Sequence, residues 1–180
     1  ITGKYIAGVR DCVSFNHYTN IGLDENDVYY NAGVLLINVE EWRKDNLTDS
    51  FARFIEKFNN DIPYADQGIV NGVMSCKSEC LDLEYNAYAP LYDFSYKDLL
   101  IFRRPHKYYS EQETSNARNN PAIVHFTTSF LSLRPWIEGC EHKYADKWLE
   151  YKMKTPWADV PLKKDNRSWK KKLAVKIYKA

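Results

Sequence analysis

The sequence has 180 residues, of which 44% are hydrophobic and 15% aromatic, a composition typical of a globular domain and not of a disordered chain. The formal net charge of +1 excludes a strongly polyanion-binding protein, so nucleic acid is not an expected partner. The charge is uneven, because residues 163–180 carry +7 and residues 1–162 carry −6. No apolar run approaches the roughly 20 residues that a membrane-spanning helix needs.

The first elements predicted along the chain are two strands with a polar segment between them. Residues 5–9 have a strand pattern. Segment 11–27 is rich in Asn and Asp, which predicts a loop or short helical turns and makes it a candidate lid. The second strand lies in VYYNAGVLLINVEEW, residues 28–42, whose run 34–37 is predicted to be buried.

Asn31, Ala32 and Gly33 interrupt this second strand, although such residues pack poorly on a pleated surface. Small side chains let another molecule approach the backbone, and the Asn31 amide offers two donors and an acceptor beside them. A bulge or bend without a ligand is the alternative interpretation.

Two amphipathic helices are predicted next. The first has one apolar face, made of Leu47, Phe51, Phe54, Ile55 and Phe58. The second lies in PYADQGIVNGVM, and its inward residues are predicted to be Ile69, Val70, Val73 and Met74. Asp66 stands near its start, where a carboxylate favours the positive end of the helix dipole, so Asp66 and Gln67 are expected to project from this end.

The later elements are a short strand at 81–83, a polar region at 92–120 with little periodicity, and a strand at 122–126 that contains His125. A further helix is marked by Tyr144, Trp148 and Tyr151. Strands that alternate with helices predict an α/β domain, and the carboxyl ends of its strands are where a site forms. Asn31, Asp66 and His125 are therefore expected to converge.

The four cysteines are interpreted as reduced thiols, since a chain of this size does not require disulfides. Cys76 and Cys80 together with Cys140 and His142 could form a zinc site, although neither spacing is that of a standard zinc knuckle. His17, His106 and His142 are interpreted as surface or structural residues.

Four motifs occur together: YYNAGVLLINVEEWR, ADQGIVN, LEYNAYAP and NPAIVHFTTSFLSLRPW. In this order and spacing, between Tyr5 and Trp136, the sequence resembles glycosyltransferase family 8, whose members are retaining enzymes that transfer glucose or galactose from a UDP-sugar. The resemblance implies an α/β fold of the GT-A type, a mixed sheet with flanking helices, in which the N-terminal nucleotide-binding strands are absent from this chain. Residues 1–162 would be the C-terminal portion of such a domain, and 163–180 a basic amphipathic tail.

The resemblance also implies roles for individual residues. Asn31, Ala32 and Gly33 would line the donor-sugar pocket, and Asp66 would hydrogen-bond sugar hydroxyls. Gln67 would lie beneath the anomeric carbon, so Asp66 and Gln67 are the candidate catalytic residues. Taken alone, Asp66 is more often a helix N-cap, His125 a strand-end histidine with its hydrogen bonds satisfied, and Arg134 a surface charge.

His125 would ligate Mn²⁺, and Arg134 would bind the diphosphate. The family pattern after the histidine normally has a glycine and a lysine, where this sequence has Thr128 and Arg134 and a loop about three residues longer. Arginine can still clamp a phosphate as a planar fork. The two further carboxylate ligands of Mn²⁺, an Asp-x-Asp motif, are expected upstream of Ile1. Without them the chain alone would bind a UDP-sugar weakly.

The tail, Lys163 to Ala180, places Trp169, Leu173 and Ile177 on one helical face with lysines around them. Such a helix suits an anionic membrane surface, and the alternative is a solvated helix or disordered tail.

The expected function is therefore transfer of a hexose from UDP-glucose or UDP-galactose to a glycan or glycolipid acceptor, such as lipopolysaccharide or another cell-surface glycan. The expected location is the cytoplasm, with peripheral contact on the inner face of the membrane. An inactive carbohydrate- or partner-binding remnant and a small zinc-stabilised module are the alternatives.

Overall fold

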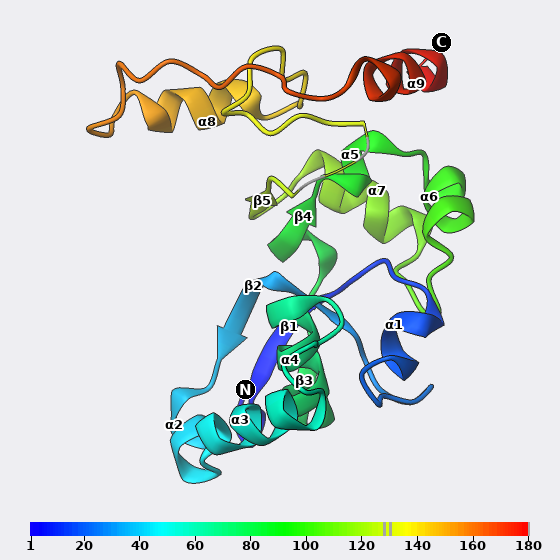
Figure 1. Cartoon of the computed structure of the whole chain (residues 1–180), viewed down its shortest axis with the longest axis vertical. Helices are drawn as coiled ribbons and strands as arrows, with labels where there is room; N and C mark the ends of the chain where they lie inside the picture. Colours follow the sequence, from blue (N-terminus) through cyan, green and yellow to red (C-terminus); the bar gives the residue numbers. More distant parts are fainter. Residues whose placement is uncertain (128, 130, 180) are drawn as a thin grey trace. The chain divides into compact units, whose positions relative to one another are not determined.

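The computed structural model describes residues 1–127, 129 and 131–179 of the chain (Figure 1). These residues form two compact units. The first comprises Ile1–Ala87 and Tyr96–Ile123, and the second comprises Tyr88–Ser95 and Val124–Ala180.

The first unit is built on a mixed sheet of three strands, in the order β2-β1-β3. β1 (Ile6–Arg10) pairs antiparallel with β2 (Tyr30–Ile37) and parallel with β3 (Ser78–Cys80). The α/β fold with a mixed sheet is thus confirmed. The strand predicted at 5–9 and the strand predicted within 28–42 are both present.

The Asn-Ala-Gly segment lies where β2 departs from β1. Gly8 is opposite Leu35, but Arg10 is opposite Tyr30, so the register shifts between these two pairs. Residues 31–34 of β2 lie opposite the single residue Val9 of β1, so β2 has three extra residues in this irregular stretch. The backbone irregularity that the alternative interpretation named is therefore present, and it frees backbone N–H groups of β2 for other partners.

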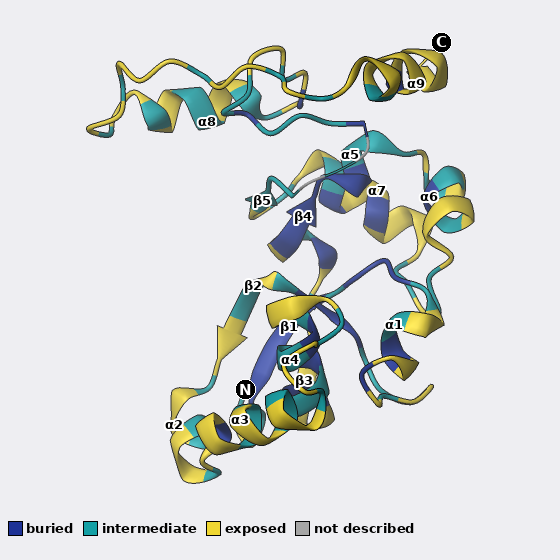
Figure 2. Cartoon of the chain, viewed as in Figure 1, coloured by how far each residue is buried: buried dark blue, intermediate teal, exposed yellow. Residues whose placement is uncertain are grey.

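The prediction that the run 34–37 is buried is wrong, because Val34 and Leu35 are only half-buried and Leu36 and Ile37 are exposed. Leu36 is 54% exposed and Ile37 is 43% exposed, whereas Tyr29, Tyr30 and Asn31 are buried (Figure 2). The reason is the strand order, because β2 is an edge strand of the described sheet and only its first half is enclosed by neighbouring elements.

Four helices accompany this sheet: α1 (Phe15–Thr19), α2 (Val39–Lys44), α3 (Leu47–Lys57) and α4 (Ala65–Met74). α1 is the short helical turn expected within segment 11–27, and α3 and α4 are the two predicted amphipathic helices. Their apolar faces meet the sheet in a core that contains Tyr5, Ile6, Tyr30, Leu47 and Met74, with Trp42, Phe51, Val70 and Val73 packed against it.

The strand predicted at 81–83 is wrong in position. A 3-10 turn η1 (Ser75–Lys77) leads directly into β3, and Leu83 begins a second 3-10 turn, η2 (Leu83–Asn86). Leu83 is fully buried in that turn while the neighbouring Asp82 is exposed. A single buried leucine between polar residues is compatible with either a turn or a strand. The pairing of β3 with β1 determines that the strand lies at Ser78–Cys80 and the turn at Leu83.

The region 92–120 contains two helices that its composition did not reveal, α6 (Tyr96–Arg103) and α7 (Glu111–Asn119), and the short helix α5 (Pro90–Asp93) ends at its start. α7 begins with a capping box, in which the Ser110 side chain accepts from Glu113 N and the Glu113 carboxylate accepts from Ser110 N. This Ser-x-x-Glu signal is visible in the sequence.

The second unit contains β5 (Val124–His125), which pairs with β4 (Ala87–Tyr88), and the helices α8 (Ala145–Lys152) and α9 (Trp169–Lys179). The helices expected around Trp148 and in the basic tail are confirmed, and the strand around His125 is shorter than predicted. On α9, Val175 is buried, while Trp169, Leu173 and Ile177 are exposed. Among the described residues, no helix is both long and apolar enough to cross a membrane.

Candidate active site

The centre of the candidate site is Asp11, which directly follows β1 and is only 5% exposed. One carboxylate oxygen, Oδ2, accepts hydrogen bonds from Asn31 Nδ2 at 3.2 Å and from Gln67 Nε2 at 3.0 Å. The other, Oδ1, accepts from the backbone N–H of Cys12 at 2.7 Å. Sequence reasoning missed Asp11 by assigning it to the polar loop. A carboxylate at the carboxyl end of a buried strand was the available signal.

Side chains of the site hold the irregular stretch of β2. Gln67 Oε1 accepts from Ala32 N at 3.1 Å, and Asn31 Oδ1 accepts from Gly33 N at 3.1 Å. Asn31 Oδ1 also accepts from the Asn86 amide at 3.0 Å. The departure of β2 from β1 is what leaves these two N–H groups available, so the local backbone geometry and the side-chain cluster depend on each other.

Asn71 links α4 to β2 through side-chain hydrogen bonds. It is fully buried, its Oδ1 accepts from Tyr30 N at 2.6 Å, and its Nδ2 donates to Tyr30 O and Gln67 O, both at 2.8 Å. Asn71 thereby satisfies backbone groups on the strand and on the helix at once. Sequence reasoning missed this residue as well, since a single Asn among apolar helix positions carries no local sign of its partner.

The start of α4 is strained. Tyr64 and Ala65 have positive φ values of 67° and 50°, which residues other than glycine rarely adopt. Tyr64 is the N-cap residue, so Asp66 is not the N-cap and instead lies exposed in the first turn. Asp66 projects as predicted, but Gln67 turns back towards β2 and Asp11. Backbone strain of this kind is often found at functional sites.

An aromatic pair lies at this strained helix start. The His17 and Tyr64 rings are stacked with centroids 4.2 Å apart, and Asn20 donates to the Tyr64 hydroxyl at 3.0 Å. Burial, together with the nearby Arg103 guanidinium, lowers the pKa of His17 and favours the neutral imidazole. The sequence predicts a surface or structural role for His17, and the structure gives it a packing role beside the candidate site.

His125 and Arg134 belong to the second unit. His125 is half-buried in β5, and the Arg134 guanidinium lies over the Trp136 ring, 5.2 Å from its centroid. Thr128, which takes the place of the family glycine, lies outside the described residues. The structure thus brings Asn31, Ala32, Gly33 and Gln67 together within one unit, and it describes the other two residues as part of the other unit.

The described residues contain no group of three or more His, Cys, Asp or Glu side chains that could hold a metal ion. One imidazole, that of His125, does not by itself fit a hard divalent cation, which prefers several oxygen ligands. The zinc alternative gains no support either, because Cys76 and Cys80 are exposed in the first unit, and His142 is buried among aromatic rings of the second.

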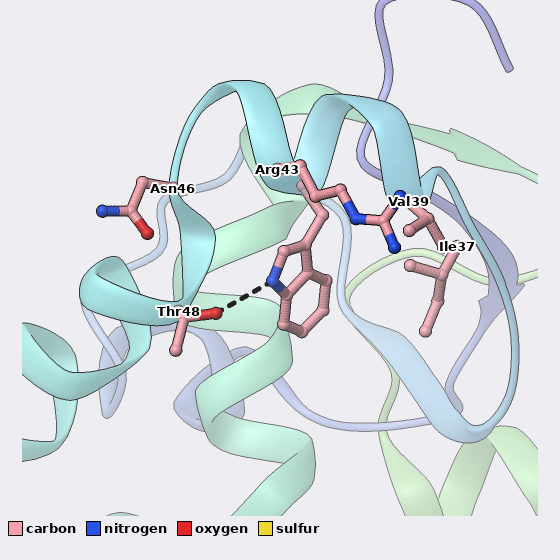
Figure 3. A pocket seen from close by; sticks show the side chains of 6 residues that line it. Ile37, Val39, Arg43, Asn46 and Thr48 are labelled. Atoms are coloured by element: carbon pink, nitrogen blue, oxygen red, sulfur yellow. Dashed lines mark hydrogen bonds between the residues drawn. The ribbon is translucent and has the colours of Figure 1, made fainter.

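A separate surface hollow lies at the far end of β2 from the Asn-Ala-Gly segment. It is lined by Ile37, Val39, Trp42, Arg43, Asn46 and Thr48, and the Trp42 indole donates to the Thr48 hydroxyl at 3.1 Å (Figure 3). Arg43 is the one charged side chain among these six lining residues, which therefore offer no carboxylate. The amide cluster around Asp11 remains the candidate active site.

The chain is similar to several known proteins. General stress protein A of Bacillus subtilis is 25% identical over 157 residues, which cover 86% of this chain and 51% of that protein. Lipopolysaccharide 1,2-glucosyltransferase of Escherichia coli is 28% identical over 144 residues, 78% of this chain and 38% of that protein. The galactosyltransferase LgtC, solved with donor and acceptor sugar analogues, superposes with a TM-score of 0.62 at 20% identity, over 86% of this chain and 53% of LgtC.

The chain spans about half the length of these proteins or less. The match to LgtC shows a GT-A-like fold, in agreement with the mixed sheet and flanking helices. Residues 1–139 match the family described as Glycosyl transferase family 8, and the chain belongs to this family of glycosyltransferases.

Proposed function

We propose that the protein is a retaining glycosyltransferase that moves glucose or galactose from a UDP-sugar to a glycan or glycolipid acceptor. The observation that carries this proposal is the cluster of two amides and one carboxylate against the small residues Ala32 and Gly33. A relative named as a glucosyltransferase and a structural neighbour named as a galactosyltransferase support a hexose donor.

The donor sugar would bind over Asn31, Ala32 and Gly33, with Asp66 at its edge. Asn31 uses one N–H for Asp11 and its oxygen for Gly33 and Asn86, so its second N–H remains for a sugar hydroxyl. Asp66 is exposed in the first turn of α4 and offers acceptor oxygens to further hydroxyls. The small side chains at positions 32 and 33 leave room for a pyranose ring.

Gln67 would supply the polar oxygen beneath the anomeric carbon. Among the described residues its Oε1 accepts from Ala32 N, and an amide oxygen has a second lone pair for an electron-poor centre. An amide is a poor covalent nucleophile, so we favour displacement on one face through an oxocarbenium-like transition state. The bond from the anomeric carbon to the diphosphate breaks, the bond to the acceptor oxygen forms on that face, and the acceptor proton passes to the departing diphosphate. Trapping of a glycosyl adduct on Gln67 would overturn this assignment.

Mn²⁺ is proposed as the cofactor, with His125 as one ligand and carboxylates upstream of Ile1 as the others. Bound there, the ion would neutralise charge on the departing diphosphate. Arg134 would act on the same group, and its packing over Trp136 would hold the planar guanidinium in a defined orientation for bidentate contacts.

The basic tail is proposed to contact an anionic membrane surface from the cytoplasmic side, where a lipid-linked acceptor would lie. α9 exposes Trp169, Leu173 and Ile177, and five lysines surround them. An amphipathic helix with lysines and a tryptophan gains energy both from apolar insertion and from attraction to anionic headgroups.

Calorimetric titration of UDP-glucose and UDP-galactose in the presence of Mn²⁺ tests the donor site. Asn31→Ala should weaken binding by about tenfold, because it removes a hydrogen bond and disrupts the cluster. Asn26→Ala, an exposed asparagine of the 11–27 segment, is the matched control and should leave binding unchanged. Saccharide binding that needs neither UDP nor Mn²⁺ would instead favour a carbohydrate-binding remnant.

A further inference from the structure

We propose that Asp11 is a positioning residue that sets the orientation of both active-site amides, those of Asn31 and Gln67. The inference rests on the proposed function for its catalytic consequence. Its structural part, the control of amide orientation, stands on the hydrogen bonds of the first unit alone.

An ionised carboxylate can only accept hydrogen bonds. Asn31 and Gln67 both direct their nitrogen atoms to Asp11 Oδ2, at 3.2 and 3.0 Å. An amide oxygen in either place would bring two acceptors together without a proton between them. Asp11 therefore selects the NH₂ side of each amide, and the oxygen of each amide must face the opposite way.

Backbone N–H groups contact the other end of both amides. Ala32 N donates to Gln67 Oε1, and Gly33 N donates to Asn31 Oδ1. A backbone N–H is a donor only, so it requires an oxygen just as the carboxylate requires an N–H. Each amide is thus held between an acceptor-only group and a donor-only group, and a flip would mismatch both contacts.

Asp11 itself is held in place by the chain. Its second oxygen, Oδ1, accepts from Cys12 N at 2.7 Å, which fixes the plane of the carboxylate. The carbonyl of Cys12 in turn accepts from Arg103 Nε at 2.9 Å, which ties this turn to α6. A carboxylate that is 5% exposed is tolerated because three donors compensate its charge.

The catalytic consequence concerns the Gln67 oxygen. If that oxygen stabilises the anomeric centre, its position depends on Asp11 through the Gln67 NH₂ group. Asp11 need not touch the sugar for this. Loss of the carboxylate should therefore lower kcat about ten- to a hundredfold. Because Asp11 also orients Asn31, donor affinity should fall too, but by no more than the roughly tenfold expected for Asn31→Ala.

Asp11→Asn is the discriminating variant, because it keeps the size and removes the acceptor-only character. The amide that this substitution introduces must point its NH₂ group either at Cys12 N or at the Asn31 and Gln67 amides, and each choice leaves donors facing donors. Asp24→Asn is the matched control, since Asp24 is an exposed carboxylate that also accepts from a backbone N–H, that of Asn26.

The primary measurement is the ¹H–¹⁵N spectrum of the side-chain NH₂ groups in the full chain. In Asp11→Asn the signals of Asn31 and Gln67 should both shift and lose their protection from solvent exchange, and in Asp24→Asn they should not. Unchanged Asn31 and Gln67 signals in Asp11→Asn would overturn the inference. This readout does not depend on turnover, so inactivity of the version that carries the upstream carboxylates would count against the proposed function and leave the positioning role to be decided by the spectrum.

A reciprocal exchange tests the donor and acceptor matching. Gln67→Glu alone places a second carboxylate against Asp11 Oδ2, so two acceptors face each other. In the double variant Asp11→Asn with Gln67→Glu, the amide introduced at position 11 can donate to the carboxylate introduced at position 67, which still accepts from Ala32 N, so that mismatch is removed. The double variant should unfold at a higher denaturant concentration than Gln67→Glu alone. A double variant no more stable than Gln67→Glu would contradict the proposed matching, because the substitution at position 11 would then relieve no mismatch left by the one at position 67.

Discussion

At the scale of single residues, the first unit depends on buried polar side chains whose donors and acceptors are matched. Asn31, Gln67 and Asn71 carry amide side chains. The Asn31 side chain bonds to the backbone of the irregular stretch in its own strand, β2, and the Gln67 and Asn71 side chains of α4 also bond to the backbone of β2. Amides suit this role because they carry no charge to bury and offer both donors and an acceptor. Replacing one of them leaves specific backbone groups unsatisfied.

Asn71→Ala should lower the free energy of unfolding by about 2–3 kcal/mol, because it orphans the buried Tyr30 N–H and carbonyl. Urea denaturation at neutral pH measures this. Asn116→Ala on α7 is the control, since Asn116 is exposed and its side chain accepts from the exposed Gln112. Equal destabilisation by the two variants would contradict the role given to Asn71.

The burial of His142 predicts that the stability of the folded chain depends on pH. Burial lowers the pKa of His142, an effect that the charge of Asp93 partly offsets. Since the unfolded chain has the ordinary histidine pKa of about 6.5, it binds more protons than the folded chain just below that pH. The stability contributed by neutral His142 is therefore present above about pH 6.5 and is lost as the pH falls towards the lowered pKa.

His142→Asn should reduce the loss of stability between about pH 7.5 and 5.5, measured by urea denaturation at each pH. Asparagine can still accept from Tyr144 N, as the His142 Nδ1 atom does at 3.1 Å. Other groups such as His17 keep their own pH dependence in both proteins. The same slope in wild type and variant would show that His142 does not titrate differently on folding.

At the scale of elements, the sequence predicted those whose apolar residues repeat regularly, such as α3, α4, α8 and α9. It misplaced β3 and overlooked α7, which have short or polar sequences. For β3 the deciding interaction is its pairing with β1, about 70 residues away in the chain, which no local pattern records. For α7 the capping box was a local signal that could have been used.

Substitutions at two glycines of α4 test how closely neighbouring groups pack against this helix. A Cβ on Gly68 would overlap the carbonyl oxygen of Pro63, whereas a Cβ on Gly72 would meet the ring of Phe54. A backbone obstacle cannot move without displacing the helix start, but a side chain can change its rotamer. Gly68→Ala should therefore destabilise the fold by about 1–3 kcal/mol, and Gly72→Ala by less, since alanine also gains about 1 kcal/mol of helix propensity. Thermal denaturation compares the stability of the two variants. A larger destabilisation by Gly72→Ala than by Gly68→Ala would contradict the strained geometry at Tyr64 and Ala65, which precede Gly68 at the helix start.

At the scale of the whole molecule, the family resemblance located half of the candidate site. Asn31, Asp66 and Gln67 stand in recognisable motifs, and in the structure Asn31 and Gln67 both donate to Asp11. Asp11 lies outside the four motifs, and Asn86 lies within LEYNAYAP, but the resemblance gave neither residue a role. They reach the cluster from the end of β1 and from η2, so their role arises only once the sheet and α4 are assembled.

The uneven charge of the chain is also a property of the whole molecule. Binding to vesicles that contain anionic lipid should be lost, or weakened at least about tenfold, when Lys170, Lys171 and Lys172 are changed to Gln, because each lysine near such a surface contributes about 1 kcal/mol. Trp169→Ala should weaken it further. Vesicle sedimentation measures this, with neutral vesicles as the control. Equal binding to neutral and anionic vesicles would contradict the electrostatic account.

The most direct test of the central claim is the release of UDP from UDP-glucose and UDP-galactose in the presence of Mn²⁺. It should be measured for the chain alone and for a version that carries the upstream carboxylates. We predict turnover with one of the two donors in the version with carboxylates, and its loss in His125→Ala and in Asn31→Ala. Absence of turnover in both versions, together with UDP binding that does not respond to Mn²⁺, would contradict the assignment of this cluster as a hexosyltransferase active site.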